Sequence, residues 1–235
     1  VMEGAAMCHL HSRLENGDLS AETQYMTSCF DEIRATTDVI IQASTGGISK
    51  MTIEERCKPL EYPKVETASL NAGSTNLGEA VYRNTFEDIR YCAREVYQRH
   101  ILPEIEVFDI GMINNIQLIA KEMSFREPLL FNLVFGHIGG MPATIESLIA
   151  FRSMVPENAK WGVTHYGRGN WWFIGAAIAM GACLVRIGFE DSRYLDDETS
   201  ASNNHELVNR LHSLIEGMGL KVASVGEARK LLRLV

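Results

Sequence analysis

The regular alternation of short apolar segments with longer amphipathic ones most constrains what this chain can fold into. Seven short segments are apolar nearly throughout, which is typical of strands buried on both faces of a parallel sheet. Segments with helical periodicity fill the intervals, so the order predicts an α/β fold. The predicted strands cover residues 5–12, 39–44, 67–72, 104–109, 129–135, 161–166 and 184–190, and the predicted helices cover 21–35, 52–60, 79–99, 113–121, 144–154, 172–180, 204–217 and 226–234.

The strand count favours a (β/α)8 TIM barrel formed by a single domain, residues 1–235. No linker, low-complexity run or charge block divides the chain. A TIM barrel has eight strands and about 250 residues, so seven strands predict that the first β/α unit precedes Val1 and is missing from this sequence. The alternative is an open doubly wound sheet. Against it, no GxGxxG follows the first strand, and polar residues end many strands rather than gathering at one switch point.

Composition narrows the class of protein. The net charge is −8 and no basic patch is present, which argues against a nucleic-acid or anionic-membrane partner. The most apolar stretch, 171–184, is too short to span a bilayer. Five cysteines, an odd number without CxxC spacing, fit a reducing cytoplasm better than a disulfide framework. We therefore expect a cytoplasmic protein with no nucleic-acid or membrane partner.

The first and last predicted strands carry a candidate metal site. His9 and His11 are two residues apart in a strand, so their side chains project to the same face. The last strand ends in two carboxylates, Glu190 and Asp191. The sequence therefore predicts a site with two histidines and one carboxylate, a ligand set that suits zinc, cobalt, manganese or iron(II).

Polar residues also follow the other predicted strands, where a barrel places its catalytic groups. Gly46 and Gly47 would let backbone N–H groups approach an anion closely. Glu106 lies within an apolar strand, where burial is costly unless the carboxylate is paired or bound to a metal. The candidate substrate-binding residues are Arg13, Thr45, Gly46, Gly47, Ser69 and Asn71.

Each of these features also has a purely structural interpretation. An HxH pair is often packed or exposed without a metal, and Glu190 at a strand end caps a turn equally well. The segment 45–47 is compatible with a simple tight turn. Glu106 would also serve as a structural partner of Arg186 inside the barrel.

Six motifs in a fixed order resemble those of the β-keto acid cleavage enzymes. The resemblance covers essentially the whole chain, including the C-terminal stretches 202–208 and 228–232. The motifs are His9-Leu10-His11-Ser12-Arg13, Ser44-Thr45-Gly46-Gly47, Ser69-Leu70-Asn71-Ala72-Gly73, Pro103-Glu104-Ile105-Glu106-Val107-Phe108, Gly139-Gly140-Met141-Pro142 and Arg186-Ile187-Gly188-Phe189-Glu190-Asp191.

The resemblance implies a zinc-dependent acyltransferase. It would condense a β-keto acid with acetyl-CoA to give acetoacetate and a CoA ester, by a Claisen and retro-Claisen exchange. Carried over by motif, the zinc ligands are His9, His11 and Glu190, and the catalytic residues are Ser44, Glu106, Arg186 and Asp191. The resemblance also implies a homo-oligomer, a dimer or tetramer. One departure is the acidic segment 192–202, where the family has a more neutral loop.

Two other functions remain open at this point. One is a metal-dependent hydrolase of the amidohydrolase type, which also has an HxH pair on an early strand and an Asp on the last. Such an enzyme needs a bridging lysine where this chain has Glu106. The other is a non-catalytic ligand-binding barrel, which predicts no turnover.

Overall fold

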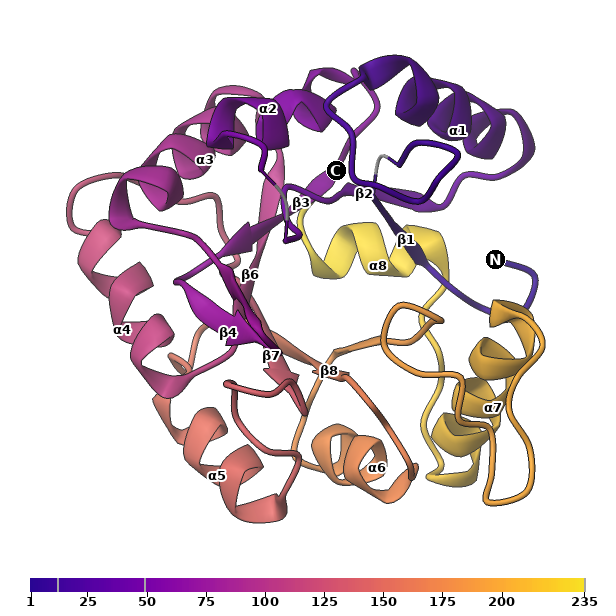
Figure 1. Ribbon diagram of the computed structural model, residues 1–235. Coiled ribbons are helices and arrows are strands. Elements are labelled where there is room, and N and C mark those ends of the chain that lie inside the picture. Colours follow the sequence, from indigo (N-terminus) through magenta and orange to yellow (C-terminus); the bar gives the residue numbers. More distant parts are fainter. Residues whose placement is uncertain (12, 49, 235) are drawn as a thin grey trace.

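In the computed structural model, which describes residues 1–11, 13–48 and 50–234, the seven predicted strands form one parallel sheet that curls into an incomplete barrel (Figure 1). Each strand pairs with the next along the sheet, which confirms the predicted fold class. Residue 12 of the first predicted strand lies outside the described residues. The strands of the sheet, in order, are β1 (Met7–Leu10), β2 (Ile40–Ala43), β3 (Thr67–Asn71), β6 (Leu102–Val107), β7 (Leu130–Phe135), β8 (Lys160–His165) and β9 (Leu184–Arg186).

Helices surround the sheet as an outer layer (Figure 1). At two helix starts a short polar side chain satisfies a free backbone N–H group: Thr52 and Thr85 each form a capping box. No described helix combines the length and the apolar character needed to cross a membrane. The helices of this layer are α1 (Thr23–Thr36), α2 (Ile53–Cys57) with the 3-10 turn η1 (Lys58–Glu61), α3 (Phe86–Gln98), α4 (Ile110–Ile119), α5 (Ile145–Met154), α6 (Trp172–Ala179) and α7 (Asn204–Gly217).

A short antiparallel hairpin replaces the first part of the predicted helix 79–99. Strands β4 (Thr75–Leu77) and β5 (Ala80–Tyr82) pair across a turn at Gly78, whose φ of 65° is readily adopted only by glycine. The prediction was therefore wrong up to residue 85, and α3 begins only after the Thr85 cap. The hairpin buries Tyr82 near the carboxyl ends of the strands, where its hydroxyl lies close to Gly46.

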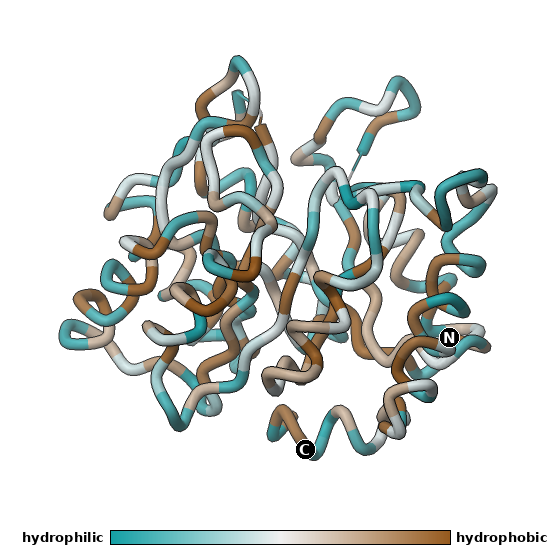
Figure 2. The backbone as a smooth tube through the Cα atoms, turned by 90° about the horizontal axis from the view of Figure 1, so that it is seen from below, coloured by the Kyte–Doolittle hydropathy of each residue, from teal (hydrophilic) through white to brown (hydrophobic). Residues whose placement is uncertain are grey.

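The last helix, α8 (Val225–Leu231), closes the amino-terminal end of the barrel. Leu232, which follows it, is buried in one cluster with Ile40, Leu102 and Leu130 from the starts of β2, β6 and β7. In Figure 2 this C-terminal helix lies below the rest of the barrel. Arg229 anchors it with ion pairs to Asp38 and Glu66, both at 2.6 Å. The apolar floor leaves the opposite, carboxyl end of the strands for a polar site.

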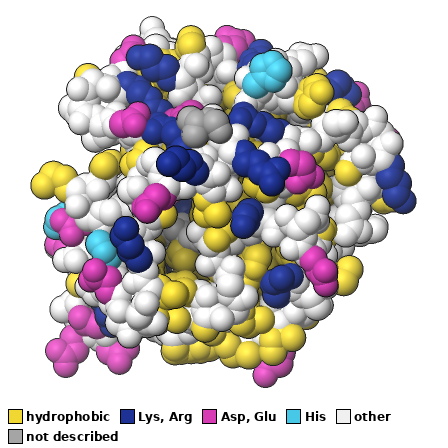
Figure 3. Space-filling view, turned by 180° about the vertical axis from the view of Figure 1, so that it is seen from behind, with side chains coloured by type: hydrophobic (Ala, Val, Ile, Leu, Met, Phe, Trp, Pro, Cys, Tyr) yellow, Lys and Arg dark blue, Asp and Glu magenta, His cyan; other side chains and the backbone are white. Residues whose placement is uncertain are grey.

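Seen from behind, the molecule shows basic, acidic and apolar side chains side by side (Figure 3). Among the ion pairs of the molecule, Arg229 and Arg34 both bind the Glu66 carboxylate. Arg126 donates to the backbone oxygen of Arg233 in the C-terminal segment. Arg229 and Arg126 thus hold the end of the chain against the barrel.

We predict that Leu232→Ala destabilises the protein by about 2–4 kcal/mol, because it removes buried methyl groups and leaves a cavity beneath the barrel. For a chain of this length, that corresponds to a melting temperature lower by about 5–15 °C, measured by thermal unfolding. Leu231→Ala is the matched control, since Leu231 is 39% exposed and its loss should cost little. Equal losses in the two variants would contradict the role of α8 as the barrel floor.

Strands β1 and β9 form the two edges of the sheet. Both are only partly buried, whereas β2, β3, β6 and β7 are buried along their whole length. Among the described strands no backbone pairing joins these two edges. Their carboxyl ends nevertheless approach each other, because His11 and Glu190 are in contact at 3.3 Å. The candidate metal residues therefore lie across the seam of the barrel.

Candidate active site

The three predicted metal ligands converge in space. The ligand atoms of His9, His11 and Glu190 all lie within 4.8 Å of one another. The two imidazole Nε2 atoms are 3.2 Å apart, His11 Nε2 is 3.3 Å from Glu190 Oε1, and His9 Nε2 is 3.9 Å from Glu190 Oε2. Ligands 2.0–2.1 Å from a tetrahedral ion lie about 3.3 Å from one another. The spacing and the donor types therefore fit a zinc-type site with three protein ligands.

The electrostatics of these residues also suit a cation. Burial lowers the pKa of His9 to about 3, so its ring is neutral at pH 7 and has a free lone pair. Burial raises the pKa of Glu190, but the hydrogen bond to His11 and the charge of Arg186 outweigh it and hold that pKa well below its usual range. Two of the three groups are thus in the protonation state that binds a metal.

Arg186, at the end of β9, organises the carboxylates beside this cluster. Its guanidinium holds Asp191 with two hydrogen bonds, at 2.7 and 3.1 Å. It also contacts Glu106 at 3.2 Å and Glu190 at 3.4 Å. Burial opposes the charge of Arg186, but these three carboxylates raise its pKa above the usual range. Arg186 therefore stays charged and holds the carboxylates together where β9 and β6 end.

Glu106 contacts the Arg186 guanidinium through one of its two carboxylate oxygens. Its other oxygen accepts a hydrogen bond of 2.7 Å from the side-chain amide of Asn71. Burial raises the pKa of Glu106 to about 7, although Arg186 opposes the shift. The pairing with Arg186 that the sequence left open is thus present, and the carboxyl still exchanges its proton near neutral pH.

We predict that Glu106→Gln changes the pH dependence of stability. The raised pKa means that folded Glu106 keeps its proton between about pH 4.5 and 7 while the unfolded chain has lost it, so wild-type stability falls as pH rises through this window. Relative to wild type, the variant should gain about 3 kcal/mol across it. Denaturant unfolding at a series of pH values measures the difference. Parallel curves for the two proteins would contradict the raised pKa.

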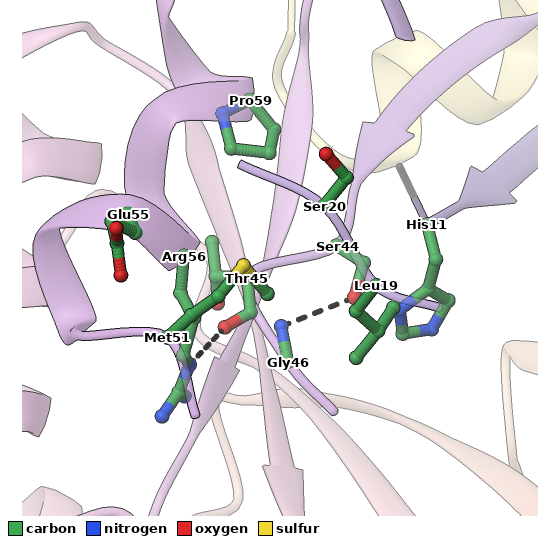
Figure 4. A pocket seen from close by; sticks show the side chains of 10 residues that line it. All are labelled: His11, Leu19, Ser20, Ser44, Thr45, Gly46, Met51, Glu55, Arg56 and Pro59. Carbon is green, nitrogen blue, oxygen red and sulfur yellow. Dashed lines mark hydrogen bonds between the residues drawn. The ribbon is translucent and has the colours of Figure 1, made fainter. Parts of the chain in front are cut away.

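Ser44, Thr45 and Gly46 line a small pocket together with His11 (Figure 4). The backbone N–H of Gly46 donates to Ser44 Oγ at 3.2 Å. A Cβ at Gly46 would meet the Tyr82 hydroxyl at 2.3 Å, and one at Gly47, where φ is 124°, would meet Leu19 at 2.2 Å. Both positions therefore require glycine for close packing. The N–H of Gly46 supports Ser44 rather than pointing unpaired at a ligand.

The structure places the other predicted substrate-binding residues in different situations. Arg13 is exposed and donates to the backbone oxygen of Gly17 in its own loop, so its predicted contact with substrate stays a prediction. Thr45 and Ser69 bind each other: Thr45 N donates to Ser69 Oγ, and Thr45 Oγ1 donates to Ser69 O. Asn71 has a buried side-chain oxygen, Oδ1, without a hydrogen-bond partner, and its role in substrate binding stays a prediction.

Sequence reasoning missed a set of buried amides beneath the cluster. Gln42 accepts from His9 Nδ1 through its Oε1 at 2.7 Å and donates through its Nε2 to Glu104 at 2.8 Å. Asn132 donates to the other Glu104 oxygen at 2.7 Å. Burial raises the pKa of Glu104, and these two donors oppose the shift. The available signal was one amide in each of two otherwise apolar strands.

A curled β/α sheet with a histidine and carboxylate cluster at the carboxyl ends of its strands defines a barrel enzyme with a candidate metal centre. The match to known proteins is specific: residues 1–234 match the beta-keto acid cleavage enzyme family, and the chain belongs to that family. The activity is accordingly of the β-keto acid cleavage or acyltransferase type.

Relatives in sequence agree with this assignment, and a solved structure shares the fold. The chain is 36% identical over 233 residues to the 3-keto-5-aminohexanoate cleavage enzyme of Fusobacterium nucleatum, covering 98% of this chain and 84% of that one. It is 29% identical over 261 residues to the 3,5-dioxohexanoate:acetyl-CoA acetone transferase of Paraburkholderia graminis, covering 99% and 84%. The apo structure of ObcA shares the fold, with a TM-score of 0.84 at 17% identity, and the match covers 99% of this chain and 62% of that chain.

Proposed function

We propose that this protein is a zinc-dependent β-keto acid cleavage enzyme that condenses a β-keto acid with acetyl-CoA, giving acetoacetate and the CoA ester of the remaining acyl part. One observation carries the proposal: the His9, His11 and Glu190 triad adjoins the Arg186–Asp191 pair. A metal-ligand set next to a fixed carboxylate is what proton removal beside a carbonyl needs. The names of the relatives, which include a 3-oxoadipate:acetyl-CoA acetyltransferase, support acetyl-CoA as the second substrate.

His9, His11 and Glu190 are the residues that would hold the ion, and the fourth position would be open to substrate. When bound, zinc supplies a Lewis acid that polarises the keto and carboxylate oxygens of a β-keto acid. Of the metals that suit this ligand set, zinc is the one that the family resemblance favours.

Asp191 is the proposed general base. It is held by two hydrogen bonds from Arg186, so one orientation of its carboxylate is fixed. Burial raises the pKa of Asp191 although Arg186 opposes it, which makes the carboxylate a stronger base than one in water. Asp191 removes the proton from the carbon between the keto and carboxylate groups. The resulting carbanion attacks the thioester carbon of acetyl-CoA, and the CoA thiolate leaves.

Ser44 is the proposed hydrogen-bond donor to the tetrahedral oxyanion. Its Oγ accepts from Gly46 N–H, which leaves the hydroxyl proton free to donate toward the substrate. In the second half, the CoA thiolate attacks the original keto carbon and the bond to the neighbouring carbon breaks. This releases the new CoA ester, and the proton taken at the start returns to the acetoacetate carbon. The Asn71 amide lies close to Gly46 and donates to Glu106, and these two side chains are proposed to orient the substrate.

The assembly and location follow the resemblance and the sequence. We infer a homo-oligomer, a dimer or tetramer, in a reducing cytoplasm, where the free thiols of the five cysteines are stable. Family membership disfavours both the hydrolase and the non-catalytic alternative.

The test is to purify the protein, measure its metal content, and assay acetoacetate formed from acetyl-CoA and a panel of β-keto acids with cationic, anionic and apolar distal groups. About one zinc per chain together with acetoacetate from any panel member supports the proposal. Protein that binds no metal and forms no acetoacetate after zinc is supplied overturns it.

A further inference from the structure

A chain of hydrogen bonds crosses the barrel interior directly beneath the candidate metal centre. It runs from His9 Nδ1 to Gln42 Oε1 (2.7 Å), from Gln42 Nε2 to Glu104 Oε2 (2.8 Å), from Asn132 Nδ2 to Glu104 Oε1 (2.7 Å) and from Thr164 Oγ1 to Asn132 Oδ1 (3.0 Å). The strand register explains the first link, since His9 lies opposite Gln42 in the β1–β2 pair. Side chains from β1, β2, β7 and β8 are thereby linked by hydrogen bonds to the Glu104 carboxylate on β6.

The carboxylate of Glu104 fixes which group donates and which accepts in each of these hydrogen bonds. Both oxygens of Glu104 accept hydrogen bonds in the structure, one from the NH2 group of Gln42 and one from the NH2 group of Asn132. The carbonyl oxygen of Gln42 then faces His9. An oxygen without a proton cannot donate, so His9 Nδ1 must carry the hydrogen of the neutral ring. The lone pair is left on Nε2, the atom that faces His11 and Glu190.

Burial makes this direction hard to reverse. Gln42 and Glu104 are 1% exposed, and Asn132 and Thr164 are fully buried. Without water to take the place of a partner, a flipped amide would put its NH2 group against His9 and its oxygen against the Glu104 oxygen, leaving buried polar groups unsatisfied. The orientation of the Asn132 amide agrees with this direction, because its oxygen accepts a hydrogen bond from the hydroxyl group of Thr164.

We propose that Glu104, acting through Gln42, is a positioning residue that fixes the ring orientation and the tautomer of His9, so that His9 Nε2 is prepared as a metal ligand before the ion arrives. The metal part of this proposal rests on the proposed function. The tautomer part rests only on the hydrogen bonds of the metal-free protein. Glu104 does not touch the substrate or the ion, and its effect passes entirely through His9.

The test compares Glu104→Gln and Gln42→Leu with wild type and with Thr164→Val. Glu104→Gln keeps the side-chain shape but lets one oxygen become an NH2 group, so the amide of Gln42 is no longer held in one direction. Thr164→Val removes a buried hydroxyl at the far end of the chain and leaves the Glu104 anchor intact, which makes it the control for general loss of stability. Thermal unfolding first establishes that each variant is folded.

Two readouts separate positioning from a merely structural role. Zinc affinity, measured by competition with a chromophoric chelator, is expected to fall about 10–100-fold in Glu104→Gln and Gln42→Leu, and to be retained in Thr164→Val. Nitrogen-15 spectra of labelled histidines in the metal-free proteins should show His9 protonated at Nδ1 in wild type and Thr164→Val. In Glu104→Gln they should show a mixture of tautomers.

The outcomes distinguish this proposal from the proposed function. If wild type binds zinc and Glu104→Gln retains both the affinity and the single Nδ1–H tautomer, the positioning role is overturned while the metal centre stands. If wild type binds no zinc, the metal part of both proposals fails. The spectra of the metal-free proteins then still decide whether Glu104 sets the tautomer, and an Nε2–H tautomer in wild type overturns that as well.

Discussion

Replacing His9 and His11 by alanine together is expected to abolish zinc binding and to reduce acetoacetate formation to background. The reason is geometric: the substitutions leave Glu190 as the sole member of the triad, and one partly exposed carboxylate does not hold zinc against water. Metal analysis after dialysis and the acetoacetate assay measure the two losses. Zinc should also stabilise wild type by about 2.7 kcal/mol at a concentration 100 times its Kd, and this gain should disappear in the variant.

The matched control replaces two histidines outside the cluster, His205 and His212, by alanine. Both lie in α7, and their side chains are 59% and 33% exposed. His205 contacts Glu3, and His212 contacts Glu216. This control removes the same number of imidazoles, so it should keep the zinc, the activity and the stabilisation by zinc. Retention of zinc by the His9 and His11 double variant would place the metal elsewhere in the protein.

Replacing Arg186 by methionine is expected to have the second large effect, a loss of about 3–5 kcal/mol in the free energy of unfolding at pH 8. Arg186 is the common partner of Glu106, Glu190 and Asp191, so its removal leaves negative charges close together in a largely buried site. Acetoacetate formation should be lost as well, because Asp191 no longer has a fixed orientation.

The pH dependence of this loss identifies its cause. Without Arg186, the folded-state pKa values of Glu106 and Asp191 rise further above their unfolded values of about 4. Their cost then grows as pH rises from the unfolded pKa toward the folded one, so the variant should lie closest to wild type near pH 4 and farthest from it at pH 8. Denaturant unfolding across this range measures the difference.

Two further variants complete the comparison. Arg186→Lys keeps the charge but not the two-pronged contact with Asp191, and should recover stability more than activity. Arg94→Met, on the exposed surface of α3, should leave both unchanged. A loss of stability in Arg186→Met that is the same at every pH would show that packing, and not the buried carboxylates, explains it.

Helices and strands were predicted correctly where the pattern of their own residues indicates them, and were missed where contacts with distant residues stabilise them. The seven strands were predicted because each is a short and mostly apolar run, a signal carried by its own residues, as in 129–135 against β7 (Leu130–Phe135). The hairpin at Thr75–Tyr82 was missed because its strands have three residues each, and their stability comes from packing around Tyr82 rather than from a local pattern.

In the candidate site, too, local strand geometry predicts some contacts and not others. His9 and His11 share a face because of strand geometry, so their pairing was visible in the sequence. Arg13 follows the end of that strand and its guanidinium binds the backbone of its own loop, so strand geometry does not place its side chain. Gln42 and Asn132 gave only a weak signal, since a lone amide in an apolar strand does not reveal its partner.

The sequence by itself determined the α/β class, the order of the strands and the residue types available for metal and proton chemistry, because these depend on local periodicity and on side-chain identity. Only the tertiary structure decided which of those residues meet. Glu190 is 179 positions from His11, and Arg186 is 80 from Glu106. Contacts at such separations arise from the curl of the sheet, which brings its first and last strands together, and burial inside it then sets the pKa values on which the chemistry depends.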